Sequence, residues 1–591
     1  MLVANMSKIK ENVKRIKLNN REQNALLIAV ELILCFIWME FSHIDWQGAT
    51  CVFFGILSAI SAYNLIDRYR NLELLKNKAG RVAFLIIAAF ATFSLVGNRG
   101  IVYPIAGRIS MGRIATLFVT YIWVIPVIIS ILHMLGKLEI ADGSFNDMSK
   151  RDKTGLILIL AMLIIVPNLF FLAALNPGIS SYDTWECMVR DAHNIIGMTN
   201  WHPPFYVIFL KMIITVWDSP YAVVLVQIAM WTVVWMSAFM FLGRRGVKSS
   251  ALMLMSLFVG TNICNCMYVI AIWKDIPYAI CLVWLTILIA RLIFEEEKLK
   301  AFYYIQLVIA LVAVCFFRQN GIVPFILSII VLGVAFRKNK RLIASLIISI
   351  VLAFAIRYPI YSALRIDNTQ MGGKFIGLGQ DITGVYVAGG TVSDEGQEMI
   401  SVLTKGNMGA SSYNPYYAKL CYDLDVPMSD FIKVYIDTFI HNPGKMLKCI
   451  MCRIDVVWDT FPGEDSFENL VNYQGHADEI ENWLDYYPGF KVTPFYKYGV
   501  SFSAESAENQ LTLAMYWRAG VWTVLLIATS VLQVYRKRSR LLLVTVPFWA
   551  QIIGLLLSTG WADCRYYWPL NLISFFVAIL GCLCISGKPC D

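Results

Sequence analysis

Long apolar segments alternate with short polar ones along most of the chain. Most apolar segments hold roughly 17–25 residues, the length of an α-helix that crosses a hydrocarbon core of about 30 Å. The pattern therefore predicts an all-α polytopic membrane protein with about 14 transmembrane helices. Their predicted positions are residues 24–41, 48–66, 81–97, 114–136, 155–175, 221–242, 250–268, 276–294, 302–317, 321–336, 342–364, 516–534, 541–558 and 566–586.

Polar sequence divides the predicted helices into groups. Residues 1–154 are expected to form an N-terminal membrane extension of four helices, and residues 155–364 a core of seven. Residues 365–515 are largely polar and predict a mainly α-helical extracytoplasmic domain, in which apolar residues recur at helical spacing. The last three helices occupy residues 516–591.

Composition excludes a soluble protein. The 591-residue chain is 58% hydrophobic and only 15% charged, too little polar sequence to cover several soluble domains. The first apolar segment follows a polar, basic stretch and lacks a small-residue cleavage site, so we expect it to remain as a span rather than be removed as a signal peptide. Cys449 and Cys452 form a C-x-x-C pair with no second pair, which favours buried thiols over a zinc site.

The net charge of +9 is unevenly distributed. Between Arg365 and Met515 there are 20 acidic and 10 basic residues, which leaves 21 acidic and 40 basic residues elsewhere. These basic residues gather in short loops, which the positive-inside rule places in the cytoplasm together with both termini. The basicity is therefore not a sign of nucleic acid binding. The segments predicted on the outer face of the cell membrane are residues 176–202, 269–275, 318–320, 365–515 and 559–565.

The segment Pro203–Trp217 decides the orientation of the chain that follows it. It is apolar but only 15 residues long, and if it crossed the membrane the basic loop at residues 244–248 would lie outside. We therefore predict an interfacial or re-entrant helix on the outer face, begun by Pro203-Pro204, because proline suits a first helical turn. One loop disagrees with this orientation, since it would place three arginines outside: Arg99, Arg108 and Arg113.

Two aspartates lie in polar segments that share the predicted outer face. Asp183 ends the stretch that begins Asn176-Pro177-Gly178, and Asp275 lies within Trp273-Lys274-Asp275-Ile276-Pro277. Either carboxylate could act as a general base or hold a divalent cation such as Mg²⁺ or Mn²⁺. Either could instead cap the helix that follows it, and Lys274 could simply neutralise Asp275.

Other outer-face residues could bind a substrate. His202 follows Trp201 and precedes two prolines, and its alternative role is that of an ordinary hydrogen-bonding group. Arg318 and Arg565 carry guanidinium groups that match phosphate oxygens, although each could also reach for lipid headgroups. The sequence has no Walker loop, G-x-S-x-G elbow or dinucleotide fingerprint, so no site for a soluble nucleotide donor is visible.

The order of these motifs resembles that of the GT-C superfamily of membrane glycosyltransferases. Within that superfamily the chain is most similar to an uncharacterised bacterial membrane-protein family found largely in Gram-positive species. The resemblance covers roughly Gly155 to Cys582. It is carried by Asn176-Pro177-Gly178 to Asp183, His202-Pro203-Pro204, Trp273 to Pro277, Arg318-Gln319-Asn320-Gly321 and Arg565-Tyr566.

The resemblance implies an inverting sugar transfer on the outer face, with juxtamembrane helices at residues 184–217. Asp183 matches the essential aspartate, as general base, and Asp275 matches a second acidic position. The donor would be a polyprenyl-phosphate sugar in the membrane, and the acceptor an envelope glycan or a lipid-linked sugar. A metal is not assigned. The candidate substrate-binding residues around the two aspartates are Lys274, His202, Arg318, Arg565, Tyr182 and Trp201.

Two other functions remain open at this point. A lipid-linked polysaccharide transporter or flippase would need charged residues inside the spans, and the candidates are Glu31, Glu40 and Arg291. A polymerase or ligase of lipid-linked oligosaccharides would share the outer-face site but use a different donor.

Overall fold

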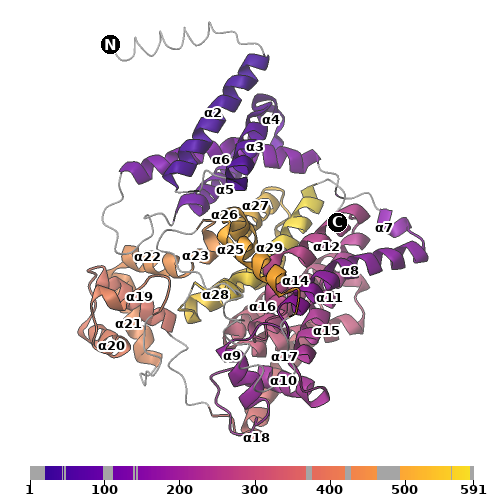
Figure 1. The fold of residues 1–591 in the computed structure, drawn as a ribbon, viewed down its shortest axis with the longest axis vertical. Helices are drawn as coiled ribbons and strands as arrows, with labels where there is room; N and C mark the ends of the chain where they lie inside the picture. The colour runs from indigo at the N-terminus through magenta and orange to yellow at the C-terminus, as the bar shows by residue number, and fades with distance from the viewer. Residues whose placement is uncertain are drawn as a thin grey trace. The chain divides into compact units, whose positions relative to one another are not determined.

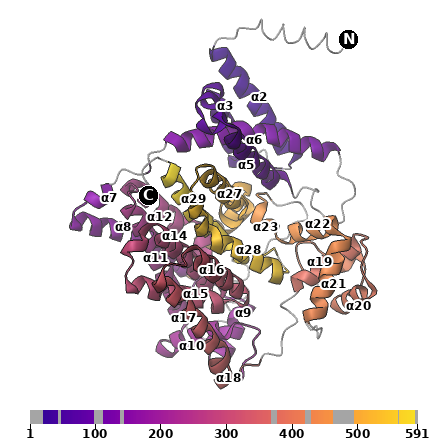
Figure 2. The same ribbon diagram turned by 180° about the vertical axis from the view of Figure 1, so that it is seen from behind.

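The computed structural model describes residues 20–42, 44, 48–97, 111–137, 140, 144–367, 376–418, 428–461, 493–560 and 562–585. These residues are mainly helical and contain no β-strand, only two isolated backbone bridges (Figures 1 and 2). The predicted all-α class is therefore confirmed. The chain divides into two compact units: Met1–Val96 with Ser110–Leu138, and Gly97–Ile109 with Glu139–Asp591.

Nine helices of the described chain are long and apolar enough to cross a membrane. Three bent pairs pass the same test, which brings the number to at most 12: Ala49–Ala62 with Leu65–Asn71 (61°), Ser249–Thr261 with Ile263–Val269 (59°) and Gln510–Trp517 with Gly520–Tyr535 (54°). The predicted spans 302–317 and 321–336 correspond to helices of at most 17 residues, so the count of 14 is not confirmed. The side of the membrane that each loop faces stays a prediction.

The first unit packs around tryptophan. The indole rings of Trp38 and Trp123 stack with their centroids 4.2 Å apart, and Trp123 Nε1 donates a hydrogen bond to Ser58 Oγ. Glu31 is buried in the same unit, whereas Glu40 is exposed near the end of its helix. The helices of this unit are α2 (Asn20–Phe41), α3 (Ala49–Ala62), α4 (Leu65–Asn71), η1 (Glu73–Lys76), α5 (Lys78–Val96) and α6 (Met111–Lys137).

The second unit is built around one helix, α14 (Asp275–Glu295), whose side chains are mostly buried. Its residue Arg291 pairs with Glu295 one turn later, at 3.1 Å, near the helix end. The other helices before residue 367 are α7 (Ser144–Asp147), α8 (Lys150–Ala174), α9 (Tyr182–Thr184), η2 (Trp185–Asp191), α10 (Pro204–Val216), α11 (Pro220–Arg244), α12 (Ser249–Thr261), α13 (Ile263–Val269), η3 (Glu296–Lys298), α15 (Ala301–Phe317), η4 (Gln319–Gly321), α16 (Ile322–Ala335), α17 (Lys340–Ala355), η5 (Ile356–Ile360) and α18 (Tyr361–Ala363).

The polar part of the chain forms a helical domain with its own core. Ile382, Val385, Ile400 and Met446 belong to this core. Cys449 and Cys452 are also buried, as predicted, and both are free thiols. The helices of this region are α19 (Ile376–Val387), α20 (Asp394–Leu403), η7 (Ala410–Ser412), α21 (Met428–His441), α22 (Pro443–Arg453) and α23 (Asp455–Trp458).

The C-terminal part of the chain returns to the helices of the bundle. Thr493 Oγ1 donates to the backbone oxygen of Ala173 at 2.6 Å, which fixes this return against the end of α8. The last helix, α29, packs against both α14 and α27. The helices of this part are α25 (Tyr496–Glu508), α26 (Gln510–Thr512), η8 (Leu513–Trp517), α27 (Gly520–Tyr535), η9 (Ser539–Thr545), α28 (Val546–Ser558) and α29 (Cys564–Ile585).

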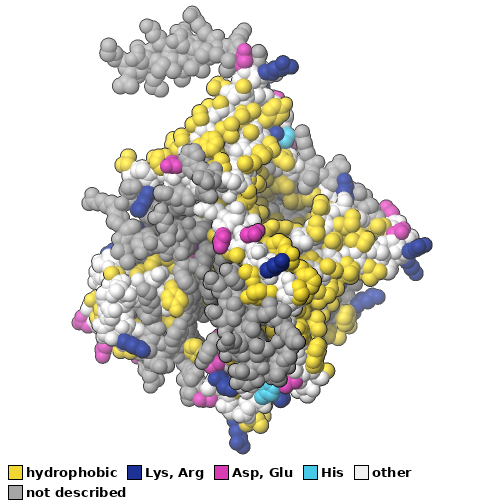
Figure 3. Space-filling model, viewed as in Figure 1, with side chains coloured by type: hydrophobic (Ala, Val, Ile, Leu, Met, Phe, Trp, Pro, Cys, Tyr) yellow, Lys and Arg dark blue, Asp and Glu magenta, His cyan; other side chains and the backbone are white. Residues whose placement is uncertain are grey.

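The exposed flank of α8 is apolar. Leu158, Met162 and Val166 have exposed fractions of 60%, 55% and 50%. Figure 3 shows hydrophobic side chains spread over the surface where α8 and α12 lie. Since a helix of a soluble protein turns only one stripe inward, apolar residues on the outside as well agree with a helix that lies in lipid.

Candidate active site

The two loops that carry the predicted aspartates are joined by their backbones. Ile179 N donates to Ile270 O and Ile272 N donates to Ile179 O, both at 3.0 Å, in an isolated parallel bridge between Ile179 and Ala271. The first loop follows α8 and the second precedes α14. The bridge therefore brings Asp183 and the Lys274-Asp275 pair together from distant parts of the sequence.

Gly178 allows this close approach. Its φ of +119° lies in a region that residues with a side chain rarely adopt. A Cβ atom at this position would lie 2.8 Å from Ile270 O and 2.8 Å from Val224 Cγ2. Glycine is therefore needed at this position of the Asn176-Pro177-Gly178 motif, because any side chain would occupy the space of the backbone bridge.

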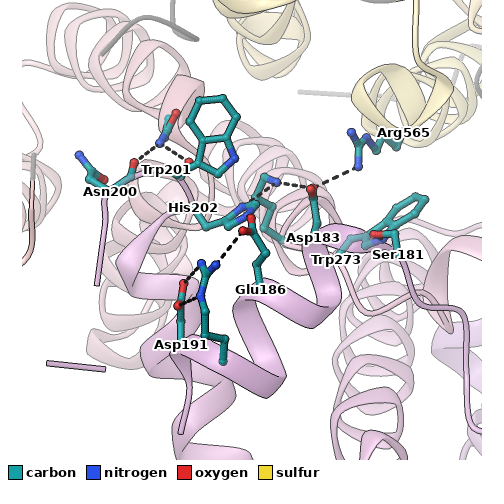
Figure 4. A network of polar contacts seen from close by, with 12 residues as sticks. Ser181, Asp183, Glu186, Asp191, Asn200, Trp201, His202, Trp273 and Arg565 are labelled. Carbon is teal, nitrogen blue, oxygen red and sulfur yellow. Dashed lines mark hydrogen bonds and ion pairs between the residues drawn. The ribbon is translucent and has the colours of Figure 1, made fainter. Parts of the chain in front are cut away.

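Asp183 lies between two cations. Its Oδ2 atom accepts a hydrogen bond from Lys274 Nζ at 2.6 Å and lies 3.4 Å from Arg565 Nη1 (Figure 4). Burial would raise the pKa of Asp183, but the charges of Lys274, Arg565 and His202 outweigh it and hold this pKa well below its usual range. Asp183 is therefore a carboxylate at neutral pH. It is not the residue that caps η2, because Thr184 directly precedes that helix.

Lys274 extends the network to a histidine. Its Nζ lies 3.3 Å from His202 Nδ1, and His202 Nε2 lies 2.7 Å from Glu186 Oε2. Glu186 also accepts from Arg190 Nη1 at 2.8 Å, and Arg190 Nε pairs with Asp191 at 2.6 Å. Four of the sequence-predicted residues, Asp183, Lys274, His202 and Arg565, thus lie in one network (Figure 4).

Asp275 pairs with Arg318. Arg318 Nε lies 2.9 Å from Asp275 Oδ1, but the contact lacks hydrogen-bond geometry. Within the described chain neither Asp275 oxygen nor Arg318 Nη1 has a hydrogen-bond partner. Asp275 is only 1% exposed, and its carboxylate does not cap α14. Burial lowers the pKa of Lys274, but Asp183 and Asp275 together raise it, so both carboxylates act on the same ammonium group.

Aromatic rings hold the two arginines. The Arg318 guanidinium carbon lies 4.1 Å from the centroid of the Tyr566 ring, within the range of a cation–π interaction. The Arg565 guanidinium carbon lies 4.9 Å from the same ring and 5.0 Å from that of Trp273. Arg565 Nε also pairs with Asp563 at 2.8 Å. Both cations are therefore oriented before any ligand binds.

An apolar cavity of about 620 Å³ adjoins this network. Its walls come mainly from α15, α16 and α17, with Phe316, Phe325 and Phe354 among the lining residues. Arg318, which pairs with Asp275, also lines it. Asp183 is not one of its lining residues. The remaining polar lining residues are Asn200, Gln319, Arg357, Tyr358 and Tyr361.

Gln319 fixes the loop before His202 to the rim of this cavity. Its Nε2 donates to Asn200 O at 2.7 Å and to Trp201 O at 2.8 Å (Figure 4). Trp201 therefore takes part through its backbone, and its side chain is 38% exposed. The side chain of Tyr182 lies outside the described part of the structure.

Sequence reasoning assigned no role to four residues around the site. Glu186, Asp563 and Tyr566 contact predicted residues directly, and Arg357 lines the cavity beside Arg318. Glu186 lies three residues after Asp183, a spacing that puts two side chains on neighbouring parts of a helix. That spacing was the one signal in the sequence that could have identified Glu186.

The residues present do not fit a divalent cation. The described residues contain no group of three or more His, Cys, Asp or Glu side chains placed to hold one. Asp183 already binds an ammonium and a guanidinium group, and Asp275 faces a guanidinium group. These cations would repel the metal that oxygen ligands otherwise attract. We therefore derive no step through a metal.

Comparison with protein-family models, with curated proteins and with solved structures finds no match to this chain.

Proposed function

We propose that the chain is a membrane glycosyltransferase that moves a sugar from a polyprenyl-phosphate donor to an envelope glycan or lipid-linked acceptor on the outer face. One observation carries this proposal: Asp183 is flanked by Lys274 and Arg565, and the Tyr566 ring that contacts Arg565 also contacts Arg318, which lines a large apolar cavity. An apolar cavity suits a lipid chain, and an arginine in its wall suits the phosphate attached to that chain.

Asp183 would act as the general base. It is ionised at neutral pH and can accept the proton of the acceptor hydroxyl while that oxygen attacks the anomeric carbon. The bond to the phosphate breaks on the opposite side, which inverts the configuration. In the free protein Lys274 and Arg565 weaken Asp183 as a base. A donor phosphate that attracts Arg565 would weaken its 3.4 Å contact with Asp183 and raise the pKa of Asp183, while Lys274 stays in contact with the carboxylate.

The cations would stabilise the leaving phosphate. Charge develops on the phosphate oxygens as the sugar departs, and fixed donors that face this charge lower the barrier. Arg318 is held by Asp275 and the Tyr566 ring, so little reorganisation is needed when the donor binds. We therefore assign Asp275 a positioning role toward Arg318, because its 1% exposure leaves it no direct contact with a substrate.

The test is mass spectrometry of cell-envelope glycans from a deletion strain that carries either the wild-type chain or Asp183→Asn. We expect the variant to insert normally and to lose about 10²–10⁴-fold in transfer rate, the usual effect of a positioned base. Asp437→Asn is the matched control, because Asp437 is half-exposed on α21 and belongs to no network at the site. Near-normal glycans with Asp183→Asn would reject the proposal.

A further inference from the structure

A continuous chain of polar contacts runs from Asp183 through Lys274 and His202 to Glu186. Lys274 Nζ lies between Asp183 Oδ2 at 2.6 Å and His202 Nδ1 at 3.3 Å. His202 Nε2 then contacts Glu186 Oε2 at 2.7 Å. Figure 4 shows His202 and Glu186 on the side of Asp183 that is opposite to Arg565.

The partners of His202 fix its tautomer. An ammonium group has no acceptor, so His202 Nδ1 must accept from Lys274, and Nε2 must carry the hydrogen that it donates to Glu186. His202 is 2% exposed, and burial and the charge of Lys274 lower its pKa. The imidazole is therefore neutral at neutral pH, with one nitrogen ready to receive a proton and the other ready to release one.

We propose that Lys274, His202 and Glu186 form a relay that carries the proton taken up by Asp183 out of the active site. This inference rests on the proposed function, since it concerns the proton that sugar transfer delivers to Asp183. Only 25% of the Asp183 side chain is exposed, and a bound acceptor would cover it further. A route through Lys274, His202 and Glu186 lets Asp183 lose this proton before the next turnover.

The proton balance is closed at each step. Asp183 takes the proton of the acceptor hydroxyl and passes a proton to Lys274 Nζ as Lys274 gives one to His202 Nδ1. His202 gives its Nε2 hydrogen to Glu186 Oε2, and Glu186 releases it to water. A half-turn of the imidazole ring then points its N–H at Glu186 and its bare nitrogen at Lys274, so every group has regained its starting charge and one proton has left the site.

The charges around the relay favour this direction. Protonation of Asp183 removes the anion that most raises the pKa of Lys274, and a neutral Lys274 no longer opposes charge on His202. Burial raises the pKa of Glu186, but His202 and Arg190 lower it overall, so Glu186 releases its proton at neutral pH. Its side chain is 13% exposed, which gives water access to the end of the relay. The charged and titratable groups that act on the relay are Asp183, Asp275, Arg565, Arg190, Asp191 and Cys187.

The experiment compares His202→Gln and Glu186→Gln with wild type in membranes of the deletion strain. The probe is a radiolabelled undecaprenyl-phosphate hexose, and the readout is label transferred to envelope material from pH 5 to 9, in H₂O and D₂O. Glutamine at position 202 can accept from Lys274 and donate to Glu186, so it keeps both contacts but cannot relay a proton. We expect both variants to lose about 10²-fold in turnover, toward the lower end for positioned proton transfer, with an altered pH profile and solvent isotope effect. Added imidazole should partly restore His202→Ala.

His193→Gln is the matched control, since His193 is 44% exposed, pairs with Asp218 and lies outside the relay. A wild-type pH profile and rate in both His202→Gln and Glu186→Gln, with Asp183→Asn inactive, would overturn the relay and leave the proposed function intact. Full activity of Asp183→Asn would overturn the proposed function itself. A loss that is equal at every pH and is not restored by imidazole would also overturn the relay, because it would indicate a purely structural role.

Discussion

Two buried ion pairs of the second unit use the same two residue types but differ in their hydrogen bonds. Arg453 binds Asp381 with two contacts, at 2.9 and 2.6 Å, and also donates to Thr559 O and Leu556 O. Arg318 makes one charge contact with Asp275, without a hydrogen bond to it. The first pair, 0% exposed on both sides, has little left to offer a ligand. In the second pair, Arg318 keeps an N–H donor that no described residue uses and that a ligand in the adjoining cavity could bind.

The Arg453–Asp381 pair, whose polar side-chain atoms all have hydrogen-bond partners, should contribute most to stability. Asp381→Asn removes the negative charge that faces the buried Arg453 guanidinium group and replaces one of the two acceptor oxygens by a donor. Loss of one partner of a buried pair typically costs about 3–5 kcal/mol in the free energy of unfolding. Unfolding of the purified protein in detergent micelles measures it, with the half-exposed Asp437→Asn as control. A variant as stable as wild type would show that the pair holds no part of the fold together.

The same substitution in the other pair should act on binding instead. Asp275→Asn removes a charge contact that has no hydrogen bond, so we expect at most about 1–3 kcal/mol of destabilisation, the cost of an unsatisfied buried group. Arg318 should lose its orientation, which raises the KM for the lipid donor more than it lowers kcat. Titration with the radiolabelled donor measures both constants. A stability loss as large as that of Asp381→Asn would erase the contrast between the two pairs.

The smallest expected effect is a loss of stability at low pH, when Asp183 takes up a proton. The pKa of Asp183 in the folded protein lies below its ordinary value of 3.8, so its contribution to stability is complete at neutral pH and is lost as pH falls through the folded pKa. We expect a loss on the order of 1 kcal/mol below about pH 4. The difference in unfolding free energy between wild type and Asp183→Asn, followed from pH 7 to pH 3, should shrink accordingly. A constant difference would show that Lys274 and Arg565 do not stabilise this carboxylate.

The hydrophobic pattern correctly predicted the all-α class, but not the number of helices that are long enough to cross a membrane. It placed α14 close to its observed position and identified Cys449 and Cys452 as buried. The expectation that Asp183 and Lys274 lie on the same side of the membrane came only from the positive-inside rule and from the resemblance. The contact between them depends on a bridge of backbone atoms between Ile179 and Ala271, which no side-chain pattern reports.

The roles of individual charged residues were harder to predict. The sequence predicts Asp275 as a catalytic carboxylate, and this role stays a prediction; the sequence did not show that tertiary packing buries Asp275 against Arg318. Glu186 received no role from the sequence, yet it binds His202, which lies in the loop before α10. Both contacts join residues more than 15 positions apart in sequence, so a local pattern does not identify the partner.

The bridge between Ile179 and Ala271 has a consequence for how this protein could change over generations. Its hydrogen bonds come from main-chain atoms, so the apolar side chains at these two positions could drift without moving Asp183 away from Lys274. Gly178 has no such freedom, because any added carbon would collide with Ile270 O. Distant descendants of this chain should therefore share this glycine and the charged pair while their surrounding hydrophobic residues diverge.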